Sequence, residues 1–202
     1  MGASGVTNLI DQAELLKLQP AFSYLSQAID FPDEVFLSQS FLSSVQTEFP
    51  EIPEKQKFLE ILESLRKYNL IDLKAHYSNL FELNKRLTLY MTYYKLSDSR
   101  EQGGVLAKLK MLYEMFGVSL EKAELTDYLP TMLEFLAVAS FTNEKSERLI
   151  DLSFCFSILE DGSYELLQKA KELTNEPYID LISVIRKVLK YCITIENEEA
   201  IV

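Results

Sequence analysis

The chain has 202 residues, of which 31 are acidic and 20 are lysine or arginine, so its formal net charge is −11. Such a negative field repels phosphate backbones, which argues against nucleic acid as a partner and against a helical regulator of DNA binding. Apolar residues make up 48% of the chain, enough for a sizeable core, but no apolar run approaches the ~18 residues that cross a bilayer. The N-terminal residues lack the basic region of a secretion signal, so we expect a cytoplasmic protein without membrane insertion.

Helical periodicity dominates the sequence. Apolar side chains recur every three or four positions in residues 58–68, 106–116, 149–159 and 182–193. Proline, glycine and short polar residues predict breaks at 31–34, 49–54, 96–99, 116–119, 160–163 and 174–177. The strand-like residues 191–195 have no evident partner, so we expect them to extend the last helix. We predict an all-α protein with one compact domain over residues 1–202 and about ten helices.

Residues suited to metal or cofactor chemistry are scarce. His76 is the sole histidine, whereas a di-iron helical bundle needs two Glu-x-x-His motifs, so we expect His76 to have a structural or surface role. Cys155 and Cys192 are too far apart for a paired-cysteine zinc motif and are expected to be reduced core residues. We therefore expect no metal, no cofactor and no catalytic site.

A tyrosine-rich stretch, NKRLTLYMTYYKLS, occupies residues 84–97. Helical spacing would place Arg86, Tyr90 and Tyr93 on one face, with Tyr94 beside them. Two interpretations stay open for this face. The tyrosines are buried with a snorkelling arginine, or they line a partly wet groove as anchors for a bound peptide.

A second stretch, ELTDYLPTMLEFLA at residues 124–137, predicts a helix with a proline in its first turn. With Asp127 as the N-cap, Pro130 loses no hydrogen bond, because the first N–H groups of a helix are unpaired. Asp127 and Glu134 would then share an acidic stripe opposite the apolar face. This stripe is either a solvated face or the acidic edge of a groove. An all-α enzyme that uses the two carboxyl groups as acid and base is a further alternative.

These stretches resemble the NarJ branch of the NarJ/TorD family, which are cytoplasmic chaperones for molybdenum-containing oxidoreductases. The signature of that branch is close to ELPDYLP followed by LEF. The residues that match it are Glu124, Leu125, Asp127, Tyr128, Leu129, Pro130, Leu133, Glu134 and Phe135. Thr126 departs from the pattern, since the family usually has proline there. FPDEVF at 31–36 is also similar to an early Tyr-Pro-Asp turn of the family, with Phe31 in place of tyrosine.

The resemblance implies an all-helical, non-catalytic chaperone. Its partner would be the basic N-terminal leader of the apo catalytic subunit of nitrate reductase, held for molybdenum cofactor insertion and complex assembly. Proteins of molybdenum cofactor biosynthesis are further candidate partners. A client of the dimethyl-sulfoxide or trimethylamine-oxide reductase type is the alternative within this class. The candidate peptide-binding residues are Arg86, Tyr90, Tyr93, Tyr94, Asp127, Tyr128, Pro130, Glu134 and Phe135.

Overall fold

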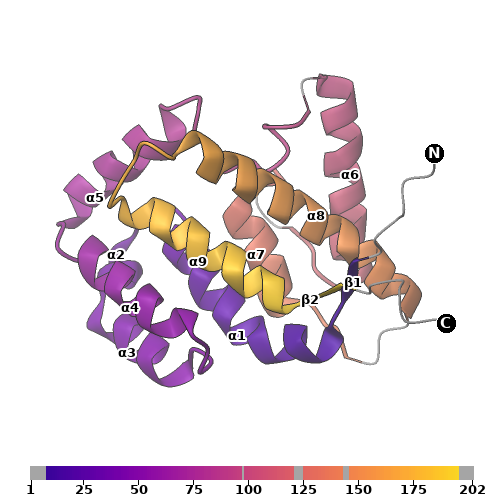
Figure 1. The fold of residues 1–202 in the computed structure, drawn as a ribbon, viewed down its shortest axis with the longest axis horizontal. Coiled ribbons are helices and arrows are strands. Elements are labelled where there is room, and N and C mark those ends of the chain that lie inside the picture. Colours follow the sequence, from indigo (N-terminus) through magenta and orange to yellow (C-terminus); the bar gives the residue numbers. More distant parts are fainter. Residues whose placement is uncertain (1–7, 97, 121–124, 143–145, 196–202) are drawn as a thin grey trace.

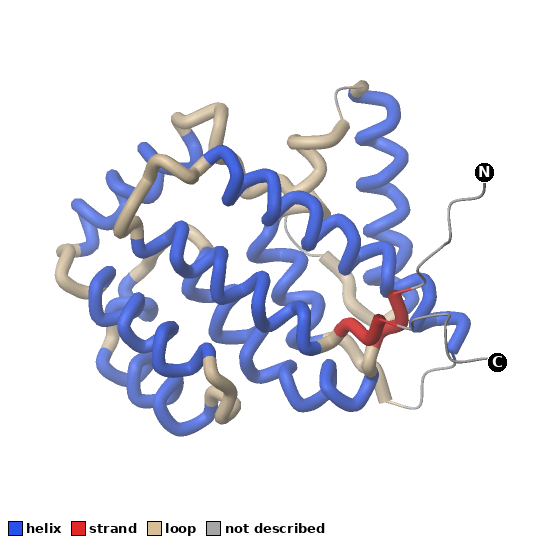
Figure 2. The backbone as a smooth tube through the Cα atoms, in the orientation of Figure 1, coloured by secondary structure: helices blue, strands red, loops and turns tan. Residues whose placement is uncertain are grey.

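The computed structural model describes residues 8–96, 98–120, 125–142 and 146–195. Its α-helices are α1 (Gln12–Ile29), α2 (Glu34–Leu37), α3 (Gln39–Glu48), α4 (Glu54–Leu65), α5 (Leu70–Tyr77), α6 (Ser99–Met115), α7 (Leu129–Val138), α8 (Ser146–Lys169) and α9 (Pro177–Tyr191). A short π-helix, η1 (Ser78–Glu82), continues from α5. Two three-residue strands, β1 (Asn8–Ile10) and β2 (Ile193–Ile195), pair antiparallel (Figure 2). The predicted all-α class is confirmed apart from this small ladder.

The helices pack around one buried apolar cluster. α9 lies against α1, α4 and α8, and α1 makes its most extensive contact with α7. In Figure 1, α2 to α5 gather at one end of the molecule and α6 stands at the other. The stripe predicted in residues 58–68 becomes the buried face of α4 as far as Leu65, since Phe58, Ile61 and Leu65 are at most 2% exposed, whereas Tyr68 lies beyond the helix and is 40% exposed. Full burial of one such side chain stabilises the fold by about 1.5–3 kcal/mol.

The last helix, α9, begins with clear local signals. Pro177 occupies the first helical position, where its missing N–H has no partner to lose. The side chain of Glu176 caps the helix by accepting a hydrogen bond from the Tyr178 N–H. The helix then stops at Tyr191, so the expectation that it runs on through 191–195 is wrong. Residues 193–195 instead pair with residues 8–10, a partner from the other end of the chain that helical periodicity does not reveal.

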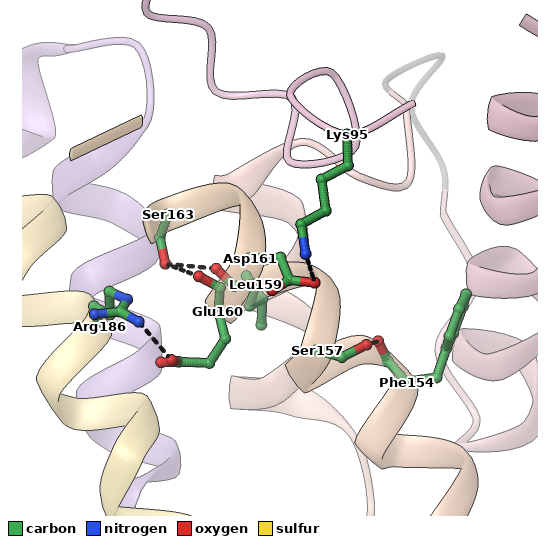
Figure 3. Close-up of polar contacts among 8 residues, drawn as sticks. All are labelled: Lys95, Phe154, Ser157, Leu159, Glu160, Asp161, Ser163 and Arg186. Carbon is green, nitrogen blue, oxygen red and sulfur yellow. Dashed lines mark hydrogen bonds and ion pairs between the residues drawn. The ribbon is translucent and has the colours of Figure 1, made fainter. Parts of the chain in front are cut away.

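The break predicted at residues 160–163 is also wrong, because α8 continues through it. Ser163 donates to the carbonyl oxygens of Leu159 and Glu160, within the helix itself (Figure 3). Glycine at position 162 permits close packing rather than a turn. A Cβ atom there would lie 2.6 Å from the carbonyl oxygen of Met91, so α8 and the backbone of residue 91 meet at this glycine.

The helical face predicted in residues 84–97 is also wrong. Residues 84–96, which we call the tyrosine segment, form turns rather than a helix. The Met91 N–H donates to the carbonyl oxygen of Asp127 at 2.9 Å, and the Leu129 N–H donates to that of Leu89 at 2.8 Å. These bonds form an isolated antiparallel bridge between Tyr90 and Tyr128. The backbone of the tyrosine segment therefore forms short turns of its own and pairs with residues 127–129 at the start of α7, instead of forming a helix.

Candidate functional site

Two adjoining hollows lie where α1, α7 and the tyrosine segment meet. The first, which we call the α7 hollow, has a volume of about 340 Å³ and is lined by Asp30, Val118, Ser119, Leu120, Tyr128, Pro130, Thr131, Glu134, Phe135 and Val138. The second, the tyrosine hollow, has a volume of about 770 Å³ and is lined by Asp30, Phe31, Tyr77, Phe81, Glu82, Asn84, Lys85, Thr88, Leu89, Tyr90, Tyr93 and Tyr128. They adjoin at Asp30 and Tyr128, which line both, and we call the two hollows together the groove.

A hydrogen-bonded chain marks the junction of the two hollows. The Tyr77 hydroxyl donates to the carbonyl oxygen of Ile29 at 3.0 Å and lies 2.9 Å from the Tyr128 hydroxyl. The Tyr128 hydroxyl also lies within 3.4 Å of Asp30 Oδ1, which accepts a 2.8 Å bond from the Phe31 N–H. Burial raises the pKa of Tyr77 well above its ordinary 10.0, and the neighbouring Tyr128 adds to the shift. Tyr77 therefore stays protonated and holds the junction as a neutral group.

Aromatic surface and negative charge face the same space. Phe31 and Tyr93 are 41% and 51% exposed, and the Tyr90 ring lies 5.3 Å from that of Tyr128. The acidic and basic side chains in the combined lining are Asp30, Glu82, Glu134 and Lys85. Three carboxylates against one ammonium make the groove acidic. The lining thus offers rings for apolar contact and carboxylates for positive charge.

α7 supplies the floor and one edge of the groove. Pro130 lies in the first turn of the helix, as predicted, but the N-cap residue is Tyr128, and its side chain makes no capping bond. Phe135 is 1% exposed and stacks on Tyr113 with ring centroids 4.3 Å apart. Glu134 lies on the solvent side of the same helix. The helix therefore buries Pro130 and Phe135 beneath the α7 hollow and presents Glu134 at its edge.

The predicted acidic stripe is wrong because Asp127 is not on the surface. Asp127 is 0% exposed and lines neither hollow, whereas Glu134 is exposed. Its Oδ2 accepts bonds from the Thr92 N–H at 3.2 Å and the Thr92 hydroxyl at 2.5 Å. A carboxylate in this position neither caps α7 nor shares a face with Glu134. The acid–base pairing of the two, and the enzyme alternative built on it, lose their geometric basis.

Two other predicted residues lie outside the groove lining. Arg86 is an exposed residue of a turn, and its N–H donates to the side chain of Asn84. The Tyr94 hydroxyl donates to the carbonyl oxygen of Thr88 at 2.7 Å, and its ring lies beneath the Lys169 ammonium. Of the nine predicted residues, the structure brings Tyr90, Tyr93, Tyr128, Pro130, Glu134 and Phe135 together in the groove lining.

Sequence reasoning missed two residues at the centre of the groove. Asp30 ends α1, and its carboxylate lines both hollows. Tyr77 is 1% exposed at the end of α5 and touches the Phe31 ring edge-on, with centroids 5.5 Å apart. The FPDEVF stretch signalled the turn after Asp30, but only the packing of α1 against α7 places that turn beside Tyr128.

The remaining ionisable groups serve the fold. His76 bonds to Glu176 at 3.0 Å and stacks on the Tyr68 ring, which fits the expected structural role. Cys155 and Cys192 are buried free thiols, and burial raises the pKa of Cys192 to about 12. Within the described ranges, no three side chains of histidine, cysteine, aspartate or glutamate gather as metal ligands. No helix in those ranges has the length and apolar character to span a bilayer.

Comparison with known proteins places the chain among assembly factors. The family model described as nitrate reductase delta subunit matches residues 45–190. A probable nitrate reductase molybdenum cofactor assembly chaperone, NarJ of Bacillus subtilis, is 35% identical over 131 residues, which cover 63% of this chain and 70% of that protein. NarJ of Escherichia coli K12, also named as such a chaperone, is 32% identical over 98 residues, 48% of this chain and 41% of its own.

A nitrate reductase-like protein, NarX of Mycobacterium tuberculosis, is 32% identical over 76 residues, which cover 38% of this chain and only 12% of that protein. The two NarJ names describe chaperones rather than catalysts, in agreement with the expectation that this protein is not an enzyme. The resemblance carried by ELTDYLPTMLEFLA is confirmed. The matched span includes α7, the tyrosine segment and every lining residue of the groove except Asp30 and Phe31. The chain belongs to the nitrate reductase delta subunit family.

Proposed function

We propose that this protein is a cytoplasmic chaperone that binds the N-terminal leader of the apo catalytic subunit of nitrate reductase. It holds that subunit for molybdenum cofactor insertion and complex assembly. The names of the relatives support the chaperone role and the nitrate reductase client. The observation that carries leader binding is the groove, in which aromatic rings and carboxylates line two adjoining hollows.

A leader peptide that is basic at one end and apolar in its middle fits this groove chemically. The rings of Phe31, Tyr90 and Tyr93 offer apolar area for its middle. Asp30 and Glu134 lie where a lysine or arginine could form charge-assisted hydrogen bonds. The net charge of −11 attracts a basic segment from a distance and speeds its encounter.

The shape of the groove favours a peptide over a small molecule. Two joined hollows of about 340 and 770 Å³ provide successive sites for side chains along one chain. A flexible leader that becomes ordered on binding loses roughly 2–5 kcal/mol of its interaction energy. Affinity is then moderate, and the client is released once its cofactor is in place.

Calorimetry with a synthetic peptide that copies the leader tests this proposal. The wild-type protein should bind it, and the affinity should fall as salt rises, because partly exposed charge pairs are screened. Asp30→Asn combined with Glu134→Gln should weaken binding by about tenfold. The matched control, Glu63→Gln with Glu172→Gln, removes two exposed carboxylates that line neither hollow and should bind as wild type does.

A shuffled peptide of the same composition separates recognition from simple charge attraction. Equal binding of the shuffled and native peptides would sink the proposed leader site. Leader peptides of dimethyl-sulfoxide and trimethylamine-oxide reductases, titrated in parallel, test the alternative clients. Tighter binding of one of those would reassign the client and keep the groove. Affinity capture of proteins that synthesise the molybdenum cofactor tests the further partners.

A further inference from the structure

The buried carboxylate of Asp127 does not line the groove, but it is hydrogen-bonded to the tyrosine segment, which does. Both of its bonds to described residues go to Thr92, through the N–H and the hydroxyl. The Thr92 oxygen in turn accepts a 3.0 Å bond from the side chain of Gln102 in α6. A carboxylate removed from water is costly unless it is hydrogen-bonded, and Asp127 Oδ1 is buried without a partner among the described residues. The two bonds from Thr92 to Oδ2 are therefore the ones that offset this cost, and they favour one position of residue 92.

The backbone joins the same two regions on either side of Tyr90. Asp127 accepts the Met91 N–H with its own carbonyl oxygen, and Leu129 donates to Leu89. Tyr93 follows Thr92 directly, and its N–H donates to the Tyr90 carbonyl at 3.1 Å. Tyr90 and Tyr93, the two residues of the tyrosine segment whose rings line the tyrosine hollow, therefore flank the residues that are hydrogen-bonded to Asp127.

α8 holds the far side of the tyrosine segment. Figure 3 shows Lys95 reaching from the segment to Asp161 on α8, and their charged atoms lie 2.6 Å apart. Gly162, the next residue, allows α8 to touch the backbone of Met91. The Lys95–Asp161 pair is half exposed and contributes little by itself. The Asp127–Thr92 contact, by contrast, is a side-chain attachment of the segment that is buried at both ends.

We propose that Asp127 is a positioning residue: through Thr92 it holds the tyrosine segment so that Tyr90 and Tyr93 face the client peptide, and it does not touch the peptide itself. This inference rests on the proposed function. Its physical basis is preorganisation, because a wall that is already ordered loses less conformational entropy when the peptide binds. The opposing model gives the Asp127 carboxylate a direct ion pair with a basic residue of the client.

The two models differ in what an amide at residue 127 would do. Asp127→Asn removes the charge but keeps an oxygen that accepts from Thr92, so a positioning role survives it. A direct ion pair does not. Asp127→Ala removes the acceptor and should disable either role. Thr92→Val removes the hydroxyl while leaving the carboxylate in place, and Thr92→Ser is its conservative rescue.

Tryptophan supplies a readout of the segment that is independent of the client. The chain contains no tryptophan, and Tyr93 is 51% exposed, so Tyr93→Trp adds a single fluorophore on the segment. We expect Asp127→Ala and Thr92→Val to raise its acrylamide quenching constant about twofold, because the segment loses its buried anchor. Asp127→Asn and Thr92→Ser should leave quenching near the Tyr93→Trp value. Far-ultraviolet circular dichroism checks that each variant is folded.

Peptide affinity is measured separately, by calorimetry with the synthetic leader and with Tyr93 intact. Asp127→Ala and Thr92→Val should bind about tenfold more weakly, and their combination should be far from additive because both remove one contact. Asp127→Asn should bind within about threefold of wild type. If Asp127→Ala does not fold, Thr92→Val carries the same test.

Two results would overturn the positioning role. One is unchanged quenching in both Asp127→Ala and Thr92→Val. The other is an Asp127→Asn protein that binds as weakly as Asp127→Ala while its quenching stays normal, which assigns the carboxylate to direct contact. Failure of the proposed function looks different: wild type binds no leader, while quenching still rises when the anchor is removed.

Discussion

The two walls of the groove are held by different forces. α7 is anchored by apolar burial, since Leu129, Met132, Leu133, Phe135 and Leu136 are at most 1% exposed. The tyrosine segment also buries apolar side chains, but its backbone is fixed by single hydrogen bonds, one buried carboxylate and one close contact with a glycine. Damage to the first wall should therefore cost stability, whereas damage to the second should alter the groove while the helices remain.

The largest effect is expected from Phe135→Ala. Removal of a ring that stacks on Tyr113 and touches the Phe116 and Phe141 rings should lower the free energy of unfolding by about 3–5 kcal/mol. Urea denaturation followed by circular dichroism measures the loss. Glu134→Ala, on the exposed side of the same helix, is the control and should change stability by less than about 0.5 kcal/mol. Similar values for the two variants would contradict apolar anchoring of α7.

Alkaline pH should weaken both walls through their tyrosines. Burial raises the pKa of Tyr113, behind α7, and of Tyr94, in the tyrosine segment, above the ordinary value of 10.0. Both stay protonated in the folded state while the unfolded chain ionises, so stability is intact below pH 10 and falls above it. Each fully buried tyrosine lowers the free energy of unfolding by about 1.4 kcal/mol per pH unit there, and half-buried Tyr94 by less.

Urea denaturation repeated from pH 8 to pH 11 measures this decline, and comparison with the Tyr94→Phe and Tyr113→Phe proteins assigns it. Each substitution should make the decline shallower, with Tyr113→Phe having the larger effect. A stability that does not change above pH 10 would mean that these hydroxyls are as accessible in the folded protein as in the unfolded chain.

Gly162→Ala should have a small effect on stability and a clear one on the tyrosine segment. The new methyl group meets the Met91 backbone, and overpacking of this kind costs about 1–3 kcal/mol, partly offset by up to about 1 kcal/mol of helix propensity. The tyrosine segment should shift, so the free energy of leader binding should weaken by more than the free energy of unfolding falls. Gly103→Ala, with open space around it, should be neutral or stabilising. Equal stability and equal leader affinity of the two variants would show that the contact between α8 and Met91 does not position the tyrosine segment.

The same contrast explains which parts of the molecule could be predicted from the sequence. The buried faces of α4 and α9 follow from local periodicity, because each helix closes its own hydrogen bonds and needs only an apolar stripe to pack. Residues 193–195 could not be predicted in this way, since their pairing partner lies at residues 8–10.

The residues of the groove region also fall into those whose faces follow from a helix and those placed by tertiary contacts. Pro130, Glu134 and Phe135 belong to a helix, so their faces could be predicted even though the cap residue was wrong. Asp127 was assigned to the surface because a helix N-cap is its commonest role there, but tertiary contact with Thr92 overrides that preference. Asp30 enters the groove only through packing between helices. No local pattern marks it.

Photo-crosslinking tests the central claim, that the leader lies in this groove, most directly. Tyr93 and Tyr191 are 51% and 40% exposed, but only Tyr93 lines the groove. A benzoylphenylalanine in place of Tyr93 should crosslink to the bound leader peptide, and one in place of Tyr191 should not. Unlabelled leader in excess should abolish the crosslink at position 93. Equal labelling at both positions, or labelling at 191 alone, would contradict the account.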